Sequence, residues 1–152
     1  MKKVISMLTV FCLVLSLTAC GSKMQSVTYC SKTEESGLKM TDTMTMEAKG
    51  DSVQSITEEI EMDLTGFDEE TQKVICGVYD ELVEQYQSIE GVEGSGEITD
   101  GIYTMHIVID ATGDAVSELA GQGLLEVDGD TNGISLQKTM DSLESNGYEK
   151  VK

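Results

Sequence analysis

Apolar and polar residues alternate along most of the first half of the chain. A period of two predicts strands with one buried face and one exposed face. The alternation begins near Val27 and continues beyond residue 60. Its clearest apolar positions are Leu38, Met40, Met44, Met46, Ile56, Ile60, Met62 and Leu64.

A turn at Gly50-Asp51-Ser52 divides this region into a hairpin. With a three-residue loop there, apolar residues pair with apolar residues, which fixes the register. Asp42 and Glu58 interrupt the apolar face. The predicted pairs are Met46 with Ile56, Met40 with Met62, Leu38 with Leu64 and, on the other face, Thr41 with Glu61.

A helix is predicted to begin at Phe67-Asp68, because apolar residues then recur at helical spacing and acidic residues occupy the first turn. Its expected apolar stripe is Val74, Ile75, Val78, Tyr79, Leu82, Val83, Tyr86 and Ile89.

A second hairpin is predicted around Asp100-Gly101, a two-residue turn signal. It pairs Ile98 with Tyr103, and Val92 with Ile109. Gly94 and Gly96 lie on the apolar face of this hairpin. The missing side chains suit close packing of a helix, which we favour, or a groove.

Two more helices follow, a short one at 114–120 and a last one capped by Ser135. Residues 121–133 read as a loop. Gly147 is expected to end the last helix and to let Tyr148 fold back on Leu143. The order β-β-β-α-β-β-α-α predicts an α+β fold with a mostly antiparallel five-stranded sheet and helices packed on one face.

The N-terminus is built differently from the rest of the chain. Lys2 and Lys3 precede an apolar run over 4–17, which is shorter than the roughly 20 residues of a membrane-spanning helix. A charged start, a short apolar stretch and small residues before a cut site predict a secretory signal, which is then removed.

The residues Leu17-Thr18-Ala19-Cys20 resemble the lipobox of bacterial lipoproteins. This resemblance implies cleavage before Cys20 and a diacylglyceryl group on its thiol, and two acyl chains hold a protein firmly at a membrane. We therefore predict a signal peptide at 1–19, a lipidated tether at 20–26 and a single domain at 27–152. The predicted location is the extracytoplasmic face of the cell membrane.

Acidic residues dominate the charge. The chain has 28 acidic and 10 basic residues, and removal of Lys2 and Lys3 changes the net charge from −18 to −20. Such a charge repels nucleic acid and favours cations or a basic partner. Lysine without arginine, and the absence of proline, suggest a Gram-positive source.

Two stretches, YQSIEGVEGSGEITDGIYTMHIVID (86–110) and SLQKTMDSLESNGYEKVK (135–152), resemble the YehR-type bacterial lipoproteins. The resemblance extends over most of the mature chain, except for the Gly/Asp-rich stretch 121–133. It implies an exported, lipid-anchored α+β domain, and it supplies no catalytic residues.

Cys30 and Cys76 remain once Cys20 is lipidated, and an even pair outside the cytoplasm suggests a disulfide. The strand register decides which way the Cys30 side chain points. A two-residue turn at Ser36-Gly37 directs Cys30 away from the helix, whereas a three-residue turn directs it inward. Both alternatives stay open at the sequence level.

The other candidates for chemistry have simpler explanations. His106, the only histidine, shares an exposed face with Thr104 and Val108. Met105 points to the opposite face, so the two cannot share a metal. The methionines of the apolar face can line an adaptable groove or bind Cu(I), but they are more simply core filling in a chain without tryptophan.

The stretch Asp128-Gly-Asp130-Thr-Asn132-Gly133 matches the opening of a calcium loop, but Thr139 stands where the loop needs a glutamate. A turn rich in Asp, Asn and Gly accounts for the same residues. We therefore predict no metal site, no cofactor and no catalytic residues.

Two binding functions fit this sequence, and a third alternative, an envelope enzyme, would need a cleft that holds His106 or a pair of carboxylates with shifted pKa. The first is a non-catalytic binding or accessory domain of the cell envelope, with an envelope protein as its partner. The second is a small-ligand or cation-binding lipoprotein associated with a transporter. A flat polar sheet face is a further candidate platform, although an ordinary solvated face is the simpler interpretation. Its residues are Thr41, Thr43, Thr45, Thr57, Glu59 and Glu61.

Overall fold

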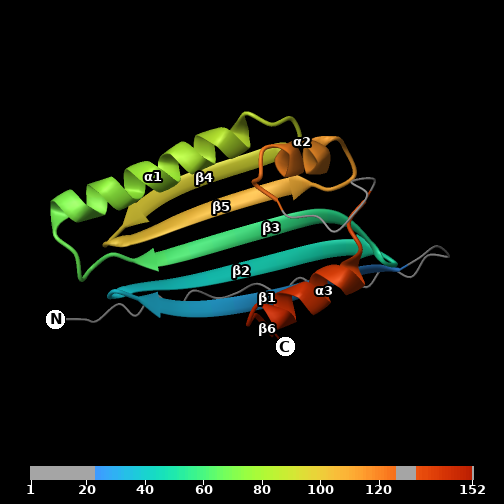
Figure 1. Cartoon of the computed structure of the whole chain (residues 1–152), viewed down its shortest axis with the longest axis horizontal. Coiled ribbons are helices and arrows are strands. Elements are labelled where there is room, and N and C mark those ends of the chain that lie inside the picture. The colour runs from blue at the N-terminus through green and yellow to red at the C-terminus, as the bar shows by residue number, and fades with distance from the viewer. Residues whose placement is uncertain (1–22, 126–132, 152) are drawn as a thin grey trace, which may run out of the picture.

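The computed structural model describes residues 23–125 and 133–151. One antiparallel sheet carries all three helices on the same side (Figure 1). Its strands lie in the order β4-β5-β3-β2-β1-β6. The elements are β1 (Met24–Glu35), β2 (Leu38–Lys49), β3 (Ser52–Asp63), α1 (Glu69–Gln87), β4 (Val92–Thr99), β5 (Ile102–Asp110), α2 (Ala115–Gly121), α3 (Leu136–Ser145) and β6 (Glu149–Lys150).

The α+β class is confirmed, but the sheet has six strands and the predicted five is wrong. The additional strand, β6, pairs with β1 through Tyr29↔Lys150 and Cys30↔Glu149. Gly147, at φ +88°, lets the chain reverse after α3 and lie along the edge of β1. A strand of two residues is too short to show alternation, so the sequence pattern could not reveal it.

The first strand begins at Met24, inside the segment 20–26 that was predicted as a tether. Its first residues pair with the end of β2, from Met24↔Lys49 onward. The Gln25 side-chain amide also donates a hydrogen bond of 2.7 Å to the Gly50 carbonyl. The folded part of the chain therefore starts four residues after Cys20.

The predicted register of the β2–β3 hairpin is confirmed by Met46↔Ile56, Met40↔Met62 and Thr41↔Glu61. The predicted three-residue loop is wrong in detail, because Lys49 pairs with Ser52 across a two-residue turn. A register shift next to Glu47 and Ala48 accommodates the extra residue in β3. The shift restores the pairing of apolar with apolar residues along the rest of the hairpin.

Two further hairpins turn at Ser36-Gly37 and Asp100-Gly101. All four residues have positive φ, between 52° and 86°. This backbone matches the right-handed twist of the flanking strands and allows a two-residue connection. The pairs predicted for the second hairpin, Ile98↔Tyr103 and Val92↔Ile109, are confirmed. The turn at Ser36-Gly37 selects the two-residue alternative for β1.

The inner face of the sheet, which we define as the face toward the helices, holds most of the core. α1 lies over β4 and β5, and α3 lies beside β1 (Figure 1). Asp68 caps α1 by accepting a hydrogen bond of 2.9 Å from the Thr71 amide, and Ser135 caps α3 as predicted. Among the described residues, no helix is long and apolar enough to cross a membrane.

Three tyrosines join the sheet to the segments that cover it. Tyr103 of β5 donates a hydrogen bond of 2.7 Å to Asp80 of α1. Tyr29 of β1 donates one of 2.7 Å to Glu144 of α3. The third hydrogen bond, of 2.5 Å, runs from Tyr148, after α3, to Asp42 of β2. Each of the three bonds joins elements that are distant in sequence.

The predicted apolar stripe of α1 is wider than the surface that α1 buries. Val83 and Tyr86 are buried, whereas Val74 and Val78 are 64% and 61% exposed. The prediction that these two valines face the core is therefore wrong. The helix meets the sheet mainly through the residues on the Val83 side, and the two valines lie outside this contact.

Gly94 and Gly96 serve the close approach of α1, as favoured from the sequence. A Cβ atom on Gly94 would lie 2.9 Å from the Ile107 side chain and 3.4 Å from that of Val83. A Cβ atom on Gly96 would overlap the Tyr103 hydroxyl. The two glycines leave room for side chains of the core, so they do not form a groove.

We predict that Gly96→Ala lowers the free energy of unfolding by about 1–3 kcal/mol, because the added methyl displaces the Tyr103 hydroxyl from Asp80. Gly77→Ala is the matched control. Gly77 lies inside α1 with nothing within 4 Å of its Cβ position, so alanine there should stabilise by about 0.5–1 kcal/mol. Urea denaturation measures both variants, and equal effects would contradict this account.

Candidate functional site

Two carboxylates stand on the inner face of the sheet, where the strands otherwise present apolar side chains. Asp42 of β2 pairs with Ile60, and Glu58 of β3 pairs with Met44. Strand register therefore places Asp42 and Glu58 as diagonal neighbours on adjacent strands, with Cα atoms about 7–8 Å apart. We call this pair of residues the inner-face carboxylates.

Asp42 is only partly satisfied. Its Oδ2 atom accepts the hydrogen bond from Tyr148, whereas its Oδ1 atom is buried and has no hydrogen-bond partner. Burial raises the pKa of the Asp42 carboxyl, and the hydrogen bond from Tyr148 opposes that shift. A buried acceptor without a donor costs free energy, about 1–3 kcal/mol. The site therefore has an unused acceptor atom.

Glu58 is the more strongly perturbed of the two. Burial, and then the nearby charge of Asp42, raise its pKa from 4.5 to about 7. Burial also raises the pKa of the Tyr86 hydroxyl, and the charge of Glu58 adds to that shift, which places Tyr86 of α1 near this carboxylate. Near neutral pH the carboxyl thus gains or loses its proton within the physiological range.

The surroundings of the inner-face carboxylates are apolar and only partly covered. Met40, Met44 and Ile60 are half-buried on β2 and β3. The strands β2 and β3 lie between α1 on one side and α3 on the other (Figure 1). The half-covered face, as we call this part of the sheet, consists of Met40, Asp42, Met44, Glu58 and Ile60.

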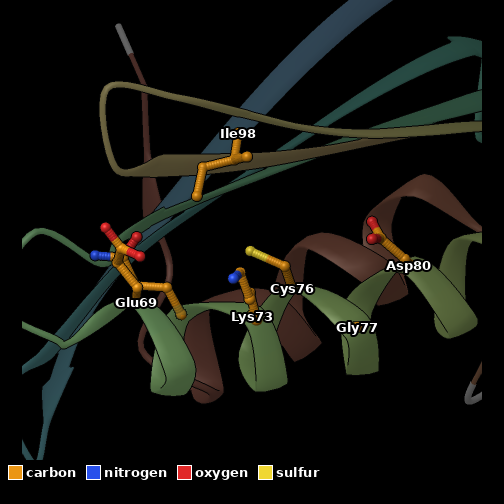
Figure 2. Close-up of a pocket in the computed structure, with 7 residues that line it drawn as sticks. Glu69, Lys73, Cys76, Gly77, Asp80 and Ile98 are labelled. Carbon is orange, nitrogen blue, oxygen red and sulfur yellow. The ribbon is translucent and has the colours of Figure 1, made fainter.

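A cavity of about 400 Å³ lies elsewhere, between the first half of α1 and Ile98 of β4 (Figure 2). The Cys76 side chain points from the helix toward the strand in this view. Burial and the charge of Asp80 raise the pKa of the Cys76 thiol, so its reactive thiolate is disfavoured. The lining residues are Glu69, Gln72, Lys73, Cys76, Gly77, Asp80 and Ile98.

Cys30 and Cys76 are both free thiols. Cys30 lies on the outer face of β1, as the two-residue turn requires, while Cys76 is on a helix that covers the inner face above β4. From β1 to β4 is four strand spacings, about 19 Å, and a disulfide needs Cα atoms within about 7 Å. The geometry therefore rules out the disulfide suggested by the even count.

His106 lies on the outer face, which bears no helix in the part of the chain that the structure describes. Its Nδ1 atom is 3.9 Å from Glu59 Oε2, and both side chains are more than 40% exposed. The described residues contain no group of three or more metal-binding side chains. Thr41, Thr43, Thr45, Thr57, Glu59 and Glu61 share this outer face, as the register predicts.

The candidate sites at the N-terminus and in the Gly/Asp-rich loop lie outside the described residues. These are the lipid-attachment residue Cys20 and the calcium-loop residues Asp128, Asp130 and Asn132. The methionines of the apolar face divide into two groups. Met46, Met62 and Met105 are buried core residues, whereas Met40 and Met44 belong to the half-covered face.

Sequence reasoning recognised Asp42 and Glu58 as exceptions but missed the residues around them. The approach of Tyr148 to Asp42 depends on how the chain returns after α3. No local pattern encodes that return, although a tyrosine directly after a helix stop was a usable signal.

We predict that Glu58→Gln stabilises the fold more at pH 8 than at pH 5, by about 2 kcal/mol. Between pH 4.5 and 7 the folded chain binds more protons at Glu58 than the unfolded chain does, so stability falls as pH rises through this range. Chemical denaturation at both pH values measures the difference.

The matched control is Glu59→Gln, one residue along β3 on the outer face. We expect it to change stability by less than about 0.5 kcal/mol at either pH. If Glu58→Gln gave the same gain at pH 5 as at pH 8, the carboxyl would not be perturbed as described.

We also predict that the mature chain keeps two free thiols, from Cys30 and Cys76. Thiol titration in denaturant without reductant should count both, and in the folded state Cys76 should react slowly, because burial disfavours its thiolate. Cys30→Ser and Cys76→Ser identify which thiol reacts. A chain with no titratable thiol, and a mass lower by two hydrogens, would contradict the structure.

Comparison with known proteins places the chain in a family. The family model described as "Protein of unknown function (DUF1307)" matches residues 25–149. The protein named "Uncharacterized lipoprotein Lin0239", from Listeria innocua, is 29% identical over 152 residues, covering 99% of this chain and 97% of the relative. That name supports a lipoprotein of unknown molecular function.

Two solved structures share the fold. The NMR structure of the YehR protein of E. coli aligns with a TM-score of 0.63 at 21% identity, over 88% of this chain and 94% of that one. The NMR structure of a protein from Streptococcus pneumoniae aligns with a TM-score of 0.53 at 12% identity, over 99% of both chains. The chain belongs to the DUF1307 family, and the resemblance to YehR-type lipoproteins that its sequence suggested is confirmed.

Proposed function

We propose that this protein is a non-catalytic binding or accessory domain, held by lipid at the extracytoplasmic face of a cell membrane. The main evidence for the lipid anchor is the sequence Leu17-Thr18-Ala19-Cys20, which follows a short apolar run. The lipoprotein name of the Listeria relative supports it. A Gram-positive source, with a single membrane to anchor in, remains part of this proposal.

The geometry near the membrane fits an anchored module. The first strand begins at Met24, four residues after the lipidated Cys20, so only residues 21–23 separate Cys20 from the fold. A tether of this length spans at most about 14 Å. The domain therefore works close to the bilayer, and its acidic surface keeps it away from anionic headgroups.

A binding role is favoured by the half-covered face. Apolar side chains and two largely desolvated carboxylates are left partly accessible where the core would be more stable with apolar residues alone. Such a departure from stable packing is typical of functional sites. The partner we propose is a protein of the envelope.

The second candidate is a small-ligand or cation-binding lipoprotein associated with a transporter. The cavity beside Cys76 favours it, because about 400 Å³ is within the range of small-ligand sites. We rank it second, because this cavity is wide open to solvent, whereas small-ligand sites bury most of the ligand surface.

We predict that Cys20→Ser abolishes lipid attachment and releases the domain from the membrane fraction, because one residue carries the whole anchor. Labelling of growing cells with a fatty acid, followed by fractionation and mass spectrometry of the N-terminal peptide, measures this. Cys30→Ser is the control and should keep the lipid. Unlipidated wild-type protein in the medium would contradict the proposal.

A further inference from the structure

We propose that the half-covered face docks a basic amphipathic segment of a partner protein, whose lysine or arginine side chain reaches the inner-face carboxylates Asp42 and Glu58. This inference rests on the proposed binding function and specifies its surface and the chemistry of its partner.

The two carboxylates have no basic partner in the part of the chain that the structure describes. The hydrogen bond from Tyr148 occupies one oxygen of Asp42, and Oδ1 is buried without a donor. Ion pairs of the described side chains include only His106 with Glu59, on the other face of the sheet. A cationic side chain docked on this face would place an opposite charge beside the two carboxylates.

The apolar surroundings determine which kind of cation fits. Lysine and arginine carry their charge on an apolar stem, which packs along apolar surface while the charged end reaches a polar group. Met40, Met44 and Ile60 supply that apolar surface on β2 and β3. Methionine adapts its shape to a bound side chain more easily than branched residues do.

One side of α1 extends the apolar surface beyond the sheet. Tyr79 packs against Tyr103 of β5, with ring centroids 6.0 Å apart. Leu82 is three residues further along, and Val78 is four residues before Leu82, which makes them neighbours on the helix. The exposed Val78 and Val74 continue this apolar strip.

Charge complementarity selects a basic occupant over an acidic or neutral one. The mature chain has a net charge of −20, and two acidic side chains lie within the apolar surface itself. An acyl chain or an anionic lipid would bring no opposite charge to either carboxyl group, and both would have to take up a proton to be covered. A basic residue flanked by apolar residues satisfies both features of the surface.

The test uses the mature chain from residue 20 with Cys20→Ser, which contains the entire described fold and needs no lipid. The probe is the synthetic amphipathic peptide acetyl-LKKLLKLLKKLLKL-amide. Binding is measured by isothermal titration calorimetry at 150 mM salt. At this salt concentration, interactions between charges more than about 8 Å apart are largely screened. Because no anchor is involved, failure of this test and failure of the anchoring experiment are distinguishable.

Two matched double variants separate docking from general attraction. Asp42→Asn with Glu58→Gln removes two charges from the inner face, and Glu59→Gln with Glu61→Gln removes two from the outer face. We expect the inner pair to weaken peptide binding at least about tenfold and the outer pair to leave it nearly unchanged. Circular dichroism confirms that each variant folds.

A second readout locates the bound peptide. With ¹³C-methyl methionine, the resonances of Met40 and Met44 should shift on titration, while that of Met24, which is 58% exposed on β1 outside the half-covered face, should not. Four results would overturn the proposal: no binding, equal losses in both double variants, equal binding of the peptide with glutamate in place of lysine, or equally tight binding of lysine amide alone.

Discussion

The apolar face of this antiparallel sheet is too wide for one helix of the chain to cover. From β4 to β1 the strands extend over about 19 Å, whereas a helix with its side chains is about 10 Å across. The chain therefore covers the face from both edges, with α1 over β4 and β5 and with α3 beside β1 (Figure 1). Among the residues that the structure describes, the middle strands receive the least cover, and the half-covered face follows from that division.

Hydrogen bonds between tyrosines and carboxylates hold the covering helices in place on the sheet. Burial and Asp80 raise the pKa of Tyr103, and the hydrogen bond to Glu144, followed by burial, raises the pKa of Tyr29 to about 12. Each phenol therefore remains a donor at every physiological pH. A tyrosine fills core volume with its ring and satisfies a helix carboxylate with its hydroxyl, which suits a chain without tryptophan.

Alternation and turn chemistry made most of the fold predictable from the sequence. The register of β2 with β3, the turn at Asp100-Gly101 and the cap at Ser135 depend on local patterns, and all are confirmed. The short strand β6 and the exposure of Val78 were not predictable, because they depend on where distant segments come together. In the sequence, the inner-face carboxylates could be recognised only as polar interruptions of an apolar strand face, since their partners are set by tertiary structure.

The central claim is that Asp42 and Glu58 remain on an apolar face because a cation from a partner neutralises them. The direct measurement is a ¹³C NMR titration of the Glu58 side-chain carboxyl. It is made on the protein without substitutions at the neighbouring Asp42, Tyr86 and Tyr148. In the free protein we expect a midpoint near 7, and with the basic peptide bound we expect a midpoint below the ordinary glutamate value of 4.5. A midpoint that is the same in both states would contradict the account.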